Sequence, residues 1–207
     1  MAIQHVGGWA ARARGLAARL GLALWAAAML LIGAILMAGH WLSLPVPVLE
    51  SPKLQAALAE LGGAGGRWQL VHVLYGQCRC SQRTLDYLQH RATPADTAER
   101  VLLVGSDAQA ASAARQRGFL VEEITAAELS QRFQLEAAPL LLVVDPEGAV
   151  RYAGGYTERQ QGLDYQDLTI LARLRERGGS ERLPAYGCAV SLELQDQLDP
   201  LGVKYLR

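Results

Sequence analysis

Cysteine is scarce in this chain, with three in 207 residues. Small secreted scaffolds that are held together by disulfides need a much denser set, and a chain of this length has room for its own hydrophobic core. The scarcity therefore excludes a disulfide-stapled scaffold. The three cysteines are unevenly placed, since Cys78 and Cys80 are separated by one residue and the third is Cys188.

An excess of charge of one sign is also missing, because 20 Lys and Arg residues balance 20 Asp and Glu residues. Arg12, Arg14 and Arg19 are the only charged residues among the first 49. Without these three, 17 basic residues remain against 20 acidic ones, so the rest of the chain is slightly acidic. Binding to a phosphate backbone requires a concentrated basic surface. We therefore expect no nucleic acid among the partners.

Charged side chains are absent between Leu20 and Leu49, and the first part of this stretch, 20–39, is apolar throughout. A helix of about 20 apolar residues spans the hydrocarbon core of a bilayer. No polar face recurs at helical spacing, which argues against a core helix of a soluble domain. The sequence therefore predicts one transmembrane helix at residues 20–40.

The charges that flank this helix indicate its orientation. The arginines precede it, and no positive charge follows until Lys53. The positive-inside rule then puts residues 1–19 in the cytoplasm and the remainder outside, which predicts a single-pass protein of a bacterial inner membrane with a periplasmic soluble domain. The alternative is a cleaved signal peptide, whose apolar region is usually about 7–15 residues long and ends at a small-residue cleavage site. Bulky His40 and Trp41 follow here, which favours a retained anchor.

Residues 41–66 predict a juxtamembrane linker with a short helix. Three prolines between positions 45 and 52 favour extended chain. The segment 53–61 has the pattern of an amphipathic helix, and the glycine-rich segment 62–66 ends it.

Residues 67–177 predict an α/β domain, because strand and helix patterns alternate along them. Apolar runs of strand length occur at 68–75, 101–104, 119–121 and 140–144. Helical patterns occur at 81–91, 107–117, 126–133 and 165–177. The turn residues 145–148 predict a hairpin to 149–153, and hence a mostly parallel sheet with an antiparallel edge, flanked by helices. Residues 178–207 form a C-terminal extension that carries Cys188 and a short helix at 191–198.

The motif Cys78-Arg79-Cys80 stands where the strand at 68–75 gives way to the next helix. A cysteine attacks a disulfide only as the thiolate, and the start of a helix lowers the pKa of a thiol through its unpaired N–H groups and its dipole. Arg79 adds a positive charge, and open α/β sheets place their sites at the carboxyl ends of strands. These are the physical requirements of a dithiol site.

The order of strand, cysteine motif, helix, strand and helix, followed by Ala138-Pro139 before the strand at 140–144 and a hairpin, resembles the thioredoxin superfamily. In layout the chain is most similar to the membrane-anchored TlpA-like members, over approximately residues 50–177. The resemblance implies a thioredoxin-like fold and a thiol–disulfide oxidoreductase without a cofactor. It also implies a cis peptide bond at Pro139, beside the cysteines, and a backbone at Ala138 that binds a substrate chain.

The motif departs from the Trp-Cys-x-x-Cys pattern of that family, because only Arg79 separates the two cysteines. A disulfide across so small a ring has difficulty in reaching ideal geometry, and strain makes it easier to reduce. We expect Cys78 to be the nucleophile and Cys80 the resolving cysteine. Alternatively, one of the two pairs with Cys188.

Two further residues have open roles. Cys188 is a third thiol that relays to the motif, a buried thiol without a redox role, or a cysteine that pairs with another chain. His72, in the strand before the motif, either accepts a proton from a cysteine or is a hydrogen-bonded core residue.

The leading functional hypothesis is a membrane-anchored, extracytoplasmic oxidoreductase whose partners are protein thiols and disulfides. The main alternative is a Cu(I)-binding metallochaperone for respiratory oxidase assembly, since thiolates suit Cu(I). The anchored copper chaperones are also thioredoxin-like, but three residues separate their cysteines. A redox-inactive thioredoxin-like binding module is the third hypothesis.

Overall fold

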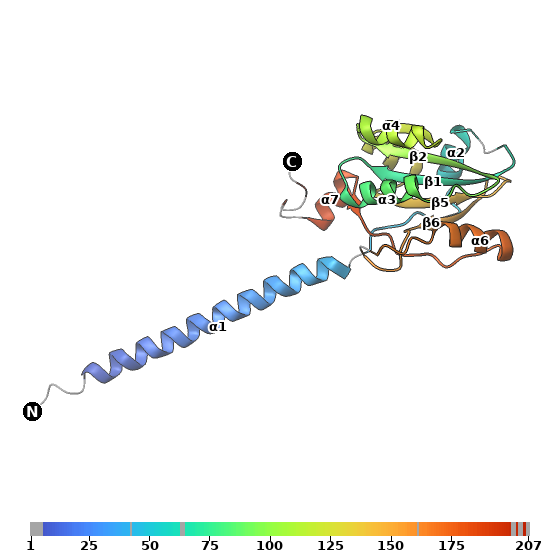
Figure 1. Ribbon diagram of the computed structural model, residues 1–207. Coiled ribbons are helices and arrows are strands. Elements are labelled where there is room, and N and C mark those ends of the chain that lie inside the picture. The colour runs from blue at the N-terminus through green and yellow to red at the C-terminus, as the bar shows by residue number, and fades with distance from the viewer. Residues whose placement is uncertain are drawn as a thin grey trace, which may run out of the picture. The chain divides into compact units, whose positions relative to one another are not determined.

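The computed structural model describes residues 6–41, 43–62, 65–160, 162–199, 202 and 205. The chain forms two compact units, Met1–Leu42 and Ser43–Arg207 (Figure 1). Residues 1–5 of the predicted cytoplasmic segment, and residues 200, 201, 203, 204, 206 and 207 of the predicted C-terminal extension, lie outside the described residues.

The first unit contains one long helix, α1 (Val6–Trp41). Its 24-residue segment Arg12–Ile35 is long and apolar enough to cross a membrane, by length and composition, and none of it is buried within the protein. Leu24 and Leu30, for example, are 71% and 75% exposed. Removing a leucine side chain from water gains about 1.5–3 kcal/mol of free energy, so exposing many of them to water is unfavourable. Such a surface suits the hydrocarbon of a bilayer better. The predicted span at 20–40 lies within α1, which begins earlier.

The second unit is built on a five-stranded sheet in the order β3-β2-β1-β5-β6, of which Figure 1 labels β2, β1, β5 and β6. Its strands are β1 (Trp68–Tyr75), β2 (Thr97–Val104), β3 (Leu120–Ile124), β5 (Leu140–Val144) and β6 (Val150–Gly154). The pairs β1–β2 and β2–β3 are parallel, whereas β1–β5 and β5–β6 are antiparallel, so β5 alone runs against the other four. The predicted mostly parallel sheet with an antiparallel hairpin at one edge is confirmed, and the fold is thioredoxin-like.

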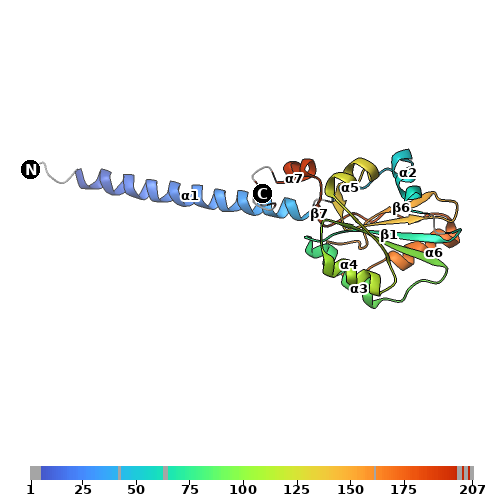
Figure 2. The same cartoon turned by 90° about the horizontal axis from the view of Figure 1, so that it is seen from above.

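Helices cover both faces of this sheet, which is why its strands are apolar on both sides (Figure 2). The helices are α2 (Pro52–Glu60), α3 (Arg79–His90), α4 (Ala108–Gln116), α5 (Ala126–Phe133), α6 (Asp167–Arg177) and α7 (Leu192–Leu198). Leu54 of α2 and Phe133 of α5 pack on one face, against residues such as Val73 of β1. On the other face, α3 and α4 pack against Leu74 and α6 packs against Leu70.

Two elements were not predicted from the sequence. Strands β4 (Ala137–Ala138) and β7 (Cys188–Ala189) form a separate antiparallel sheet of two residues each. The prediction that the second strand begins at Val101 was wrong, because β2 begins at Thr97. The reason is that its polar side chains have partners: Glu99 pairs with Arg91 at 2.7 Å, and Arg100 Nη2 donates to the Leu61 carbonyl at 2.6 Å.

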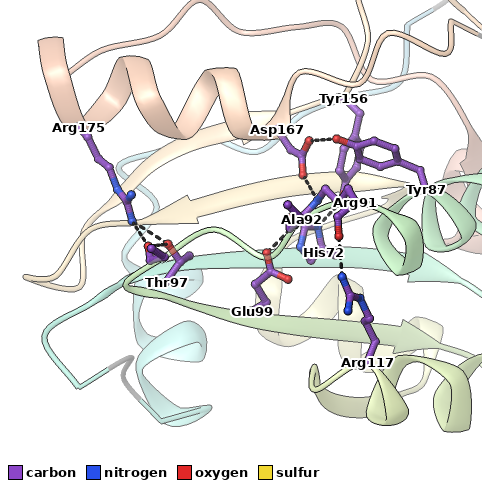
Figure 3. A network of polar contacts seen from close by, with 11 residues as sticks. His72, Tyr87, Arg91, Ala92, Thr97, Glu99, Arg117, Tyr156, Asp167 and Arg175 are labelled. Atoms are coloured by element: carbon purple, nitrogen blue, oxygen red, sulfur yellow. Dashed lines mark hydrogen bonds and ion pairs between the residues drawn. The ribbon is translucent and has the colours of Figure 1, made fainter.

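A buried polar network joins α3, β2 and α6 (Figure 3). Arg91 Nε lies 2.7 Å from Asp167 Oδ2, and its Nη2 lies 2.7 Å from Glu99 Oε1. Tyr87 donates a hydrogen bond of 2.7 Å to the other Asp167 oxygen. The Asp167 side chain has no exposed surface, so its charge is compensated by these two partners and not by water.

Replacing Asp167 with alanine is expected to lower the free energy of unfolding by about 3–5 kcal/mol, because Arg91 then remains buried with less compensation. Urea titration of the detergent-solubilised full-length chain, followed by its tryptophan fluorescence, measures this change. The matched control is Glu123→Gln, which breaks the exposed Arg115–Glu123 pair and is expected to cost less than about 1 kcal/mol. Equal effects of the two substitutions would contradict the assignment of Arg91–Asp167 as a buried structural pair.

Candidate active site

The cysteine motif lies where β1 ends and α3 begins, as the sequence predicts. The chain turns after Tyr75, and the Cys78 N–H donates to the Tyr75 carbonyl at 2.9 Å. Gly76 packs so closely against Asp107 that a Cβ there would lie 2.8 Å from the Asp107 Cβ. Cys78 is the N-cap residue of α3, in extended conformation, and Cys80 is in the first helical turn. The sulfur of Cys78 is therefore next to unpaired N–H groups at a helix start.

The three cysteines differ in exposure. Cys78 has no exposed surface, whereas Cys80 and Cys188 are half-buried. The Cys78 Sγ lies 3.9 Å from the carbonyl oxygen of Ala138, the last residue of β4, directly before Pro139. The buried member of the motif is thus the one predicted to be the nucleophile.

The thiols of Cys188 and Cys80 both hydrogen-bond to Cys78, and these bonds lower the pKa of Cys78 well below its usual value. The backbone N–H groups of Ser81 and Cys80 act in the same direction, whereas burial acts against them. A thiolate that accepts several hydrogen bonds is favoured over the thiol even where little water reaches it. The arrangement therefore favours the thiolate form of Cys78.

The Ala138–Pro139 peptide bond is cis, as the resemblance implied. Ala138 belongs to β4, and in the register of the small sheet it is opposite Cys188 of β7. Gly187 lies directly against the same turn, so that a Cβ there would collide with the Ala138 carbonyl oxygen. The structure therefore brings Cys188 to the two motif cysteines, which the sequence left open.

A pocket opens beside the exposed side of this cluster. Its wall includes Cys80, Pro139 and three tyrosines, namely Tyr156, Tyr165 and Tyr186. Arg83 also lines it. Sequence analysis missed the tyrosines, because they come from the long segment after β6 and from the C-terminal extension, and share no motif.

His72 is a buried core residue beneath this pocket. Its Nδ1 lies 2.8 Å from the Tyr156 hydroxyl, which in turn donates to the Leu140 carbonyl at 3.3 Å. Burial, together with the positive charge of Arg91, lowers the pKa of His72 well below its usual value, so the ring is neutral. Of the two roles predicted for His72, the structure places it in the hydrogen-bonded core.

Comparison with known proteins identifies no family. No family model matches the chain, and no curated protein matches it. Among solved structures, the chain is similar to an uncharacterized conserved protein from Geobacillus kaustophilus, with 12% identity and a TM-score of 0.48, over 61% of this chain and 77% of the other. A putative thioredoxin from Neisseria meningitidis has 13% identity and a TM-score of 0.41, over 55% and 79%.

A third similar structure is the thioredoxin domain of a thiol-disulfide oxidoreductase from Bacteroides vulgatus, with 14% identity and a TM-score of 0.33, over 42% of this chain and 69% of the other. All three TM-scores are below 0.5, and no property of these proteins is carried over to this chain from them.

The described part of the chain contains no candidate metal site. No group of three or more His, Cys, Asp or Glu side chains there is arranged to hold a metal ion.

The lowered pKa of Cys78 predicts that the reduced chain carries a thiolate at neutral pH. The ultraviolet absorbance of thiolate is expected to be larger in the wild-type chain than in Cys78→Ser, and to fall only as the pH drops through the lowered pKa of Cys78. The same measurement on Cys80→Ser is the control, which keeps the Cys188 hydrogen bond and therefore most of the signal. A signal that first rises in the usual range of a thiol would contradict this electrostatic account.

Proposed function

We propose that this chain is a thiol–disulfide oxidoreductase that acts on protein thiols and disulfides. The observation that supports it best is the convergence of thiols beside Pro139, with Cys78 hydrogen-bonded by two other cysteines and its thiolate form favoured. A cysteine nucleophile needs a lowered thiol pKa to be a thiolate at neutral pH, together with neighbours that position it.

The exchange follows the usual chemistry of a dithiol. The Cys78 thiolate attacks one sulfur of a substrate disulfide, the S–S bond breaks, and the other substrate sulfur leaves as a thiolate. Cys80 then loses its proton to solvent and attacks the Cys78 sulfur, which releases the second substrate thiolate and leaves the Cys-x-Cys motif oxidised. Two electrons pass from the protein to the substrate, and the reverse sequence oxidises a substrate dithiol.

The pocket beside Cys80 suits the residues next to the reacting cysteine of a protein substrate. Its wall of tyrosines and Pro139 suits an apolar side chain, and Arg83 in its lining suits a polar or acidic neighbour. Such a pocket positions a substrate by side chains near the disulfide and requires no cofactor.

The helix α1 supports an anchored location for this activity. The candidate membrane span is Arg12–Ile35, and the basic residues stand at its N-terminal end, so the positive-inside rule favours an orientation with residues 43–207 outside the cytoplasm. The same layout underlies the similarity to TlpA-like thioredoxins. Outside the cytoplasm, disulfides form and persist, so an exchange catalyst has substrates there.

Activity is expected to depend on Cys78. Replacement by serine should reduce the exchange of a dye-labelled glutathione disulfide, with dithiothreitol as reductant, to the rate of dithiothreitol alone, because serine supplies no thiolate. Cys80→Ser should slow the release of a mixed disulfide that is formed on Cys78, and mass spectrometry detects that adduct. Ser112→Ala, at an exposed position of α4, is the control. Full activity of the Cys78→Ser chain would remove this proposal.

The proposed topology predicts which side of the membrane exposes the half-buried Cys80. In cells with a permeabilised outer membrane and an intact inner membrane, a membrane-impermeant maleimide should label Cys80. Labelling that appears only after the inner membrane is broken would place the domain in the cytoplasm and contradict the orientation.

A further inference from the structure

The C-terminal extension returns to the cysteine motif along the short strand β4. The pairs are Ala137 with Ala189 and Ala138 with Cys188. Gly187 is in contact with Ala138 and the Pro139 ring, at a position where a side chain does not fit. An extended chain can add to an exposed strand edge by backbone hydrogen bonds. Here the edge beside Pro139 is already occupied by the chain's own residues.

The strand β7 brings the thiol of Cys188 to the sulfur of Cys78. The Cys188 thiol hydrogen-bonds to Cys78 and is the largest single cause of its lowered pKa. Cys78 is also close to the Ala138 carbonyl and to the start of α3, and it has no exposed surface. Because Cys78 has no exposed surface, a substrate sulfur can reach it only after a neighbouring group moves, and Cys188 is one of the groups that interact with it.

The strand β7 is positioned by contacts on both of its sides. The Val190 N–H donates to the Glu136 carbonyl at 2.7 Å, and the Ala189 N–H donates to the Tyr205 hydroxyl at 3.0 Å. Three residues before β7, the Ala185 carbonyl accepts a hydrogen bond of 2.8 Å from the Leu44 N–H. The ladder itself has only two residue pairs, far fewer than the β1–β2 ladder of the main sheet. A ladder of two residue pairs is short enough for β7 to separate from β4 when a substrate chain replaces it.

We infer that β7 is an internal occupant of the substrate edge, and that Cys188 forms a disulfide with Cys78 when the chain is oxidised. This inference rests on the proposed function and specifies its regulation. In the reduced chain a substrate competes with β7 for Cys78. In the oxidised chain the Cys78–Cys188 bond fixes β7 in place and closes the site until a thiol reduces that bond.

The oxidation balances with a small disulfide such as oxidised glutathione. The half-exposed Cys188 loses its proton to solvent and attacks one glutathione sulfur, so that the S–S bond breaks and one glutathione leaves as a thiolate. The Cys78 thiolate then attacks the Cys188 sulfur and displaces the second glutathione thiolate. Cys78 and Cys188 together lose two electrons, the oxidant gains two, and each released thiolate takes a proton from water.

The Cys78–Cys80 disulfide that ends the proposed exchange is disfavoured at equilibrium, relative to the Cys78–Cys188 bond, by its geometry. Those two residues are separated by Arg79 alone, at the start of a helix, and closing a bond between them requires the first turn of α3 to change. Cys188 approaches from a different strand, so that its bond to Cys78 closes no small ring within the first turn of α3.

Tryptic mapping under non-reducing conditions separates these possibilities, because the bond after Arg79 is cleaved. Cys78 is then in peptide 68–79, Cys80 in peptide 80–83 and Cys188 in peptide 183–204. The full-length chain is equilibrated in detergent with oxidised glutathione, acid-quenched, blocked with maleimide and digested. The expected main product links 68–79 to 183–204, in the wild-type chain and in Cys80→Ser. A main product that links 68–79 to 80–83 would overturn the inference.

Access to Cys78 provides the second test. Gly187→Ala should push β7 away from Ala138 and raise the rate at which iodoacetamide alkylates Cys78 in the reduced chain by severalfold. Gly179→Ala is the matched control, since Gly179 lies in the same extension and nothing is within 4 Å of a Cβ at that position. An unchanged alkylation rate in a folded Gly187→Ala chain would overturn the role of β7 as a displaceable occupant.

The two proposals fail in different ways. Exchange activity that persists in Cys78→Ser would remove the proposed function, whatever the peptide map shows. Exchange activity that requires Cys78, together with a Cys78–Cys80 map, would keep the proposed function and remove only the internal occupant.

Discussion

The pairing of Ala138 with Cys188 is the contact on which the proposed chemistry of this protein depends. It joins the C-terminal extension to the loop at Pro139, and it delivers the thiol that does most to lower the pKa of Cys78. Without this pairing, Cys78 would be a helix-start thiol with the moderate activation that such a position gives. With it, the cysteine becomes a buried thiolate whose nearest partner belongs to the same chain. Reactivity and restricted access therefore have the same structural cause.

The rest of the domain holds this contact in place. The main sheet is buried on both faces by helices, which fixes the carboxyl end of β1 and the start of α3. Beneath the pocket, neutral His72 positions Tyr156, and the Arg91–Asp167 pair ties α3 to α6. Each of these buried polar groups is a structural support with a partner from a distant segment, and none of them needs to exchange a proton with the thiols for the site to work.

Much of the fold could be predicted from local pattern, but only part of the site could. The apolar run 68–75 and the helical pattern 126–133 have the same bounds in the structure, because each is short and uniform. The early start of β2 was missed, since Glu99 and Arg100 are strand residues only because distant groups pair with them. The sequence also located the cysteine motif at a helix start.

The sequence could not show that Cys188 meets Cys78. The strands that bring them together, β4 and β7, have two residues each, too few to produce a periodic pattern. The burial of Cys78 could not be predicted for the same reason, because the segment beside it comes from the far end of the chain. Cysteine count and spacing suggested a third thiol, and only the tertiary structure gives it a position.

The account makes Cys78 a member of every disulfide that this chain forms on its own. Counting protein thiols across a series of glutathione redox buffers tests that claim most directly, with the full-length chain in detergent. We expect one two-electron couple in the wild-type chain and none in Cys78→Ser. A couple that persists in Cys78→Ser, formed by Cys80 and Cys188, would contradict it.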